Sequence, residues 1–74
     1  MEPYEVERLR ERCSDVITRI YGYHYNLKIV NVSHRDESII VQGTFLDYTV
    51  KGGERKSFTM KFDKGLRVLD VSIT

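Results

Sequence analysis

The spacing of apolar residues in this chain changes once, at Gly22. Before Gly22 they recur at steps of three and four, which is the spacing of one helix face. These residues are Val6, Leu9, Cys13, Val16, Ile17 and Ile20. After Gly22, apolar and polar residues alternate, as in β-strands. Pro3 suits a first helical turn and Gly22 a left-handed cap, so we expect one helix over residues 3–21 and only strands after it.

The alternating part of the chain divides into four strands. We expect them over residues 25–33, 38–50, 55–63 and 66–73. A parallel crossover needs about a dozen residues, and the connections here are far shorter, so neighbouring strands must be antiparallel. The sequence therefore predicts a single α+β domain over residues 1–74: one N-terminal helix packed on a four-stranded antiparallel β-meander in the order 1-2-3-4.

The order of these elements is similar to that of cystatin-like and PepSY-type small domains. Cystatins carry a Gln-x-Val-x-Gly motif, whereas the stretch "VQGTF" has Gly43 directly after Gln42. The resemblance therefore concerns only the order of the elements, and it assigns no functional residue.

The pair Gly52-Gly53 could belong to a phosphate-binding loop or to a hairpin. A phosphate loop leads into a helix, but the residues after this pair alternate like a strand. Gly-Gly also suits the two-residue turns of hairpins, so we expect such a turn. It would pair Phe45 with Met60, and a second turn at Lys64-Gly65 would place Met60 beside Leu69. The predicted core is then Leu9, Cys13, Val16, Ile20, Val41, Phe45, Phe58, Met60, Leu69 and Val71.

The same alternation predicts which residues lie on the face of the sheet that the helix leaves open. In this register, Val30 and Val32 join the helix side. Seven apolar residues fall on the open face: Leu27, Ile29, Ile40, Leu46, Tyr48, Val50 and Val68. An apolar patch of this extent is unusual on a monomer. We therefore expect a protein-interaction module that forms a homodimer, or binds a hetero-partner, through this face.

Nucleic-acid binding is the alternative function. The chain has 12 basic and 11 acidic residues, which argues against a general polycation. Residues 51–67, however, hold six basic residues and two acidic ones. A basic hairpin of this kind is able to contact phosphates. Its candidate residues are Lys51, Arg55, Lys56, Lys61 and Arg67.

The residue types that carry catalysis are few, and they are poorly spaced for it. Cys13, the only cysteine, belongs to the helix stripe, so we expect it to be buried and inert. His24 and His34 fall at opposite ends of the first strand, too far apart to share a zinc ion. No serine has an evident histidine and carboxylate partner. We therefore expect no enzyme activity, no metal and no cofactor.

The sequence also bears on location. No apolar run exceeds the three residues of 39–41, and a membrane helix needs about 20. The first residues lack the features of a signal peptide. We therefore expect a cytoplasmic protein that does not act at a membrane.

Overall fold

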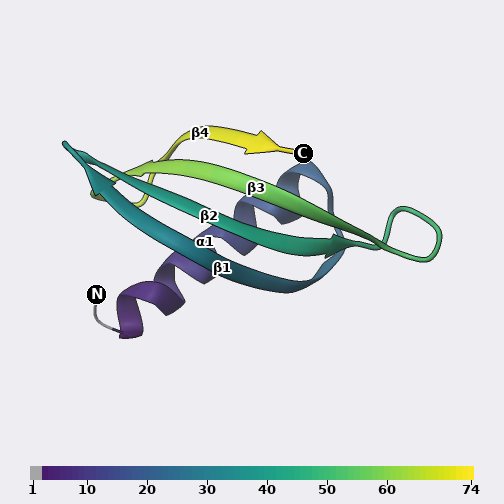
Figure 1. Cartoon of the computed structure of the whole chain (residues 1–74). Helices are drawn as coiled ribbons and strands as arrows, with labels where there is room; N and C mark the ends of the chain where they lie inside the picture. Colours follow the sequence, from purple (N-terminus) through teal and green to yellow (C-terminus); the bar gives the residue numbers. More distant parts are fainter. Residues whose placement is uncertain (1–2) are drawn as a thin grey trace.

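The computed structural model describes residues 3–74 as one helix and four strands (Figure 1). They are α1 (Pro3–Ile20), β1 (His24–Arg35), β2 (Ser38–Asp47), β3 (Glu54–Asp63) and β4 (Val68–Ile73). All neighbouring strands are antiparallel, and their order is β1-β2-β3-β4. The helix runs obliquely behind the sheet in Figure 1. The predicted α+β fold, with one helix on a four-stranded meander, is confirmed.

The helix ends at the predicted glycine cap. Gly22 has a φ of 87°, and the backbone N–H of Tyr21 donates to the carbonyl of Ile17 over 2.7 Å. The apolar stripe is buried at Leu9, Cys13, Val16 and Ile17. Ile20 is 55 % exposed, so its predicted place in the core is wrong. At this end of the sheet the ring of Tyr21 lies 5.6 Å from the ring of Phe45 and covers the core instead.

The loop between β2 and β3 is longer than predicted. Phe45 pairs with Lys56 and Val41 pairs with Met60, because six residues, 48–53, connect the strands instead of two. The predicted two-residue turn is therefore wrong, although Gly52 and Gly53 do bend the chain, with φ values of 84° and 80°. The register shift is four residues, an even number, so each side chain keeps its predicted face. The buried hydrophobic residues of the strands are Val41, Phe45, Phe58, Met60 and Phe62.

A β-bulge in β4 changes the predicted packing of the last strand. Lys61 pairs with Asp70 and Phe62 with Val68, which leaves Leu69 without a partner. Leu69 is 53 % exposed, so its predicted place in the core is wrong. Val71 pairs with Met60 and is partly buried against the core.

Strand β1 contains two such irregularities. One lies between Tyr25 and Lys28, where Asn26 has a φ of 51°, and the other lies between Ile29 and Asn31. Each bulge adds a residue to one strand only, which reverses the alternation of the side chains that follow. As a result Val32 packs on the core as predicted, but Val30 is 70 % exposed.

Candidate functional site: a tyrosine cluster on the open face

The open face of the sheet is less apolar than predicted. Three of the seven predicted interface residues, Leu27, Ile29 and Val68, pack against the buried core instead. The bulges in β1 and β4 cause this change. Ile40 and Leu46 remain on the open face, half-buried, while Tyr48 and Val50 lie exposed in the loop of residues 48–53. The predicted placement of Leu27, Ile29 and Val68 is therefore wrong, and an interface through the other four stays a prediction.

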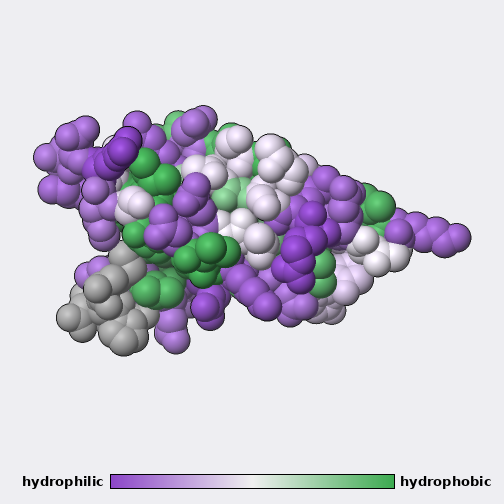
Figure 2. All heavy atoms as spheres, viewed as in Figure 1, coloured by the Kyte–Doolittle hydropathy of each residue, from purple (hydrophilic) through white to green (hydrophobic). Residues whose placement is uncertain are grey.

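Polar side chains occupy the middle of the open face. Asn31 donates a hydrogen bond to Gln42 over 3.3 Å, and Arg55 donates to Thr44 over 3.3 Å. Figure 2 views the molecule from the side on which the strands lie in front of the helix. On this side the hydrophobic residues form separate groups, with hydrophilic residues between them. Such a face tolerates water over most of its area.

Three tyrosines form a compact group at the end of this face where β1 begins. Tyr23, Tyr25 and Tyr48, here called the tyrosine cluster, are 61 %, 49 % and 47 % exposed. The ring centroid of Tyr25 lies 4.9 Å from that of Tyr23 and 5.1 Å from that of Tyr48, in nearly perpendicular arrangements. Tyr25 also pairs with Leu46 on β2. The cluster is the largest exposed aromatic group in the part of the chain that the structure describes.

The loop after β2 fixes the position of Tyr48. The buried Asp47 carboxylate accepts hydrogen bonds from the Thr49 N–H over 2.9 Å and from the Thr49 hydroxyl over 2.5 Å. The bonds from the Thr49 hydroxyl and N–H hold the pKa of Asp47 below its ordinary value. Gly53 lies against the Tyr48 ring, where an added Cβ would be 3.3 Å from Cε1. The loop that carries Tyr48 is therefore held by hydrogen bonds at its start and by the contact of Gly53 with the Tyr48 ring at its end.

The geometry of the cluster favours contact with another surface over capture of a small ion. The Tyr23 hydroxyl donates to the Tyr25 hydroxyl, and this hydrogen bond raises the pKa of Tyr23. The rings touch edge to face, so no space remains between them for the cation that an aromatic cage would hold. Fixed tyrosines offer an apolar ring and a polar hydroxyl at a small entropic cost. Of the three tyrosines, only Tyr48 is among the predicted interface residues. The bulge at Asn26 and the length of the loop bring the three rings together, and neither could be read from the sequence.

The predicted basic residues do not form one surface. Lys56 lies on the helix side, where its Nζ is 3.6 Å from Glu54 Oε2 and 5.9 Å from the centre of the Tyr21 ring. Arg55 and Lys61 pair with Leu46 and Ile40 on the open face. Lys51 and Arg67 lie in the loops at opposite ends of β3. The nucleic-acid alternative thus lacks a continuous basic groove.

A serine and a histidine, two residue types used in catalysis, do contact each other. Sequence analysis did not predict this contact. Ser14 Oγ lies 3.1 Å from His24 Nε2, and His24 Nδ1 lies 3.2 Å from the carbonyl oxygen of Gly22. In a neutral imidazole Nδ1 then donates to the carbonyl and Nε2 accepts from the serine. Ser14 lies inside a helix, whose N–H groups are already bonded and form no oxyanion hole. With His24 edge-on to Phe45, the pair ties the helix to β1.

The structure also bears on a reactive thiol, a metal site and a membrane-spanning helix. Burial raises the pKa of the Cys13 thiol to about 12, which keeps it protonated. Residues 3–74 contain no group of three or more histidine, cysteine, aspartate or glutamate side chains that is able to hold a metal ion. Within the same residues, no helix combines the length and the apolar character needed to cross a membrane.

Comparison with known proteins adds no assignment. No protein-family model, no characterised protein and no solved structure matches the chain. Its function is therefore inferred from its own residues.

Proposed function

We propose that this chain is a non-catalytic protein-interaction module and that the tyrosine cluster is its contact site. The observation that carries the proposal is the group of three half-exposed tyrosine rings, in which Tyr25 of β1 packs against both Tyr23 and the loop residue Tyr48. Tyrosine is enriched among the residues that dominate binding energy in protein interfaces. Leu46 pairs with Tyr25, and Val50 is exposed in the same loop as Tyr48.

A second copy of the chain is the partner proposed first. The helix covers one face of the sheet, and the cluster lies on the other. In a twofold dimer, the same cluster would meet its own copy and remove both from water. The apolar surface of the cluster is small compared with the whole interface of a stable dimer. We therefore expect a dimer affinity in the micromolar range or weaker.

The test is light scattering coupled to size-exclusion chromatography, with protein in the micromolar to hundred-micromolar range. We expect wild type to dimerise with increasing concentration. The double variant Tyr25→Ser/Tyr48→Ser and the single variant Leu46→Lys are expected to remain monomeric. Ile40→Ser is the matched control, because Ile40 is apolar and half-buried on the same face but lies at the other end of β2. Circular dichroism checks that each variant is folded.

Three outcomes would contradict parts of the proposal. A wild type that is monomeric throughout would exclude the second copy and leave only a foreign partner. A dimer that survives the Tyr25→Ser/Tyr48→Ser change would move the interface away from the cluster. Binding of single-stranded RNA or DNA with a steep salt dependence, lost on Arg55→Ala and Lys56→Ala, would support the nucleic-acid alternative instead.

A further inference from the structure

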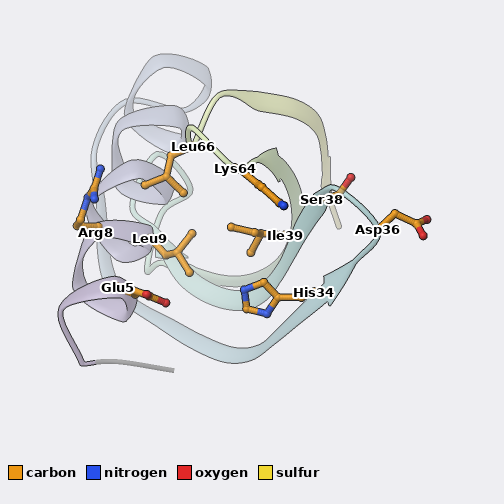
Figure 3. A pocket seen from close by; sticks show the side chains of 9 residues that line it. All are labelled: Glu5, Arg8, Leu9, His34, Asp36, Ser38, Ile39, Lys64 and Leu66. Carbon is orange, nitrogen blue, oxygen red and sulfur yellow. The ribbon is translucent and has the colours of Figure 1, made fainter.

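A groove with a volume of about 330 Å³ lies at the other end of the sheet, on the helix side (Figure 3). It is bordered by the first turns of α1, the end of the β1–β2 hairpin and the turn between β3 and β4. Leu9, Ile39 and Leu66 line its floor, and their side chains point toward a common space. Ligand pockets typically combine such an apolar floor with a few polar groups, and this volume is at the lower end of their range.

Three of the ionisable side chains that line the groove come from different segments. Glu5 comes from α1 and His34 from β1, and their side chains point toward each other in Figure 3. Lys64, from the turn after β3, extends along the rim of the groove beside Ile39. Lys64 Nζ also lies 3.2 Å from Glu37 Oε2, but both side chains are highly exposed. The ammonium has three donors, so it retains donors for a ligand. The remaining bordering side chains point away from the centre: Arg8, Asp36 and Ser38.

The backbone at Leu66 is an independent feature of the same groove. Leu66 has a φ of 64°, a conformation that is rare for a bulky residue and natural for glycine. Two hydrogen bonds hold it: the Leu66 N–H donates to the Asp63 carbonyl, and Arg12 Nε donates to the Leu66 carbonyl, each over 3.0 Å. Strained residues that the surroundings hold in place are concentrated at ligand sites. Here the strain keeps an apolar side chain in the floor of the groove.

We infer that this groove binds a small zwitterion with an apolar side chain, which is the chemistry of a free apolar amino acid. The carboxylate of Glu5 accepts hydrogen bonds from the ligand ammonium. His34 and Lys64 donate to the ligand carboxylate. The ligand side chain packs on Leu9, Ile39 and Leu66. A ligand with one charged group would leave part of this set without a partner. The site lies at the opposite end of the sheet from the tyrosine cluster and does not depend on it.

The experiment uses leucine as the probe and compares it with two truncated analogues. Isocaproate lacks the ammonium group, and isoamylamine lacks the carboxylate. In two-dimensional NMR titrations of the full chain, leucine is expected to shift the amides of Leu9, His34, Ile39 and Leu66. Both analogues are expected to bind at least about tenfold more weakly, since each loses a charge-assisted hydrogen bond. An analogue that binds as tightly as leucine would overturn the inference.

Two variants separate binding from folding. Glu5→Gln removes the charge and is expected to weaken leucine binding about tenfold while leaving isocaproate binding unchanged. Leu66→Gly removes part of the floor but suits the backbone at φ 64°, so it is expected to fold and to lose leucine binding. Ile20→Ser, at the exposed end of α1 farthest from Glu5, is the control and should bind like wild type. No leucine-dependent shifts in wild type at millimolar leucine, or full binding by Leu66→Gly, would refute the site.

Discussion

Gly43 lies where β1, β2 and an aromatic ring approach one another most closely. It pairs with Ile29 on one side and Phe58 on the other. A Cβ at this position would lie 2.2 Å from the Lys28 carbonyl oxygen and 2.6 Å from Phe58 Cζ. The ring is able to move, but the carbonyl is held in the sheet.

We therefore predict that Gly43→Ala lowers the free energy of unfolding by about 3 kcal/mol through overpacking. Urea unfolding followed by circular dichroism measures the change. Gly65→Ala is the control, because its added Cβ would meet only Asp63 Oδ1 at an ordinary 3.5 Å. A loss at Gly43→Ala no larger than that at Gly65→Ala would show that the strands are not this close.

Cys13 is a second residue whose behaviour follows from its surroundings. Desolvation raises its pKa to about 12, more than the charge of Arg12 lowers it. Thiol reagents attack the thiolate, so the native protein should be labelled only when it unfolds. We expect the labelling rate to increase with urea in parallel with the unfolded fraction. Rapid and complete labelling without denaturant would contradict a packed helix–sheet interface.

At the scale of elements, sequence and structure agree on the number, type and order of the helix and strands. The helical stripe and the short connections carry that information directly. The predicted and the observed structure differ in β1, where the bulges at Asn26 and Val30 change which side chains face the helix. A bulge leaves no mark in the pattern of apolar and polar residues. Simple alternation along β1 therefore assigns Leu27 and Ile29 to the open face. Only the pairing with β2 reveals that they are covered.

The loop between β2 and β3 shows the same limit. The Gly52-Gly53 pair marks the bend in the sequence, but the length of the loop depends on the cap that Asp47 and Thr49 form. Asp-x-Thr is a common local motif, and as a signal for where a turn begins it is weaker than a glycine pair. The predicted site residue Tyr48 was therefore placed in a strand, whereas its ring lies in a loop against Tyr25.

The Asp47 cap predicts a pH dependence. Its pKa is lowered in the folded state, so its contribution to stability is complete above its unfolded pKa and is lost as pH falls through the folded value. We expect wild type to lose stability below about pH 4, near the ordinary pKa of aspartate. Asp47→Asn removes this carboxylate, so its free energy of unfolding should fall less between neutral pH and pH 3. Equal losses in both proteins would show that the cap does not contribute.

At the scale of the whole molecule, the two ends of the sheet differ. One end carries exposed tyrosines on the open face, and the other carries a charged groove on the helix side. Three of the predicted interface residues, Leu46, Tyr48 and Val50, lie at the first end, and no predicted site residue lines the groove. The groove combines residues from three distant segments, so it exists only after folding. Between the two ends, hydrogen-bonded polar side chains cover the open face.

An NMR dilution series on the wild-type chain tests directly whether the tyrosine cluster is the contact site of the dimer. We expect amide shifts to depend on concentration at residues 23–25 and 46–50, around the tyrosine cluster. The amides of Asn31, Gln42 and Thr59, in the polar middle of the same face, should remain unchanged. Concentration-dependent shifts centred on those polar residues or along β4, with residues 23–25 and 46–50 unaffected, would contradict the assignment of the tyrosine cluster as the contact site.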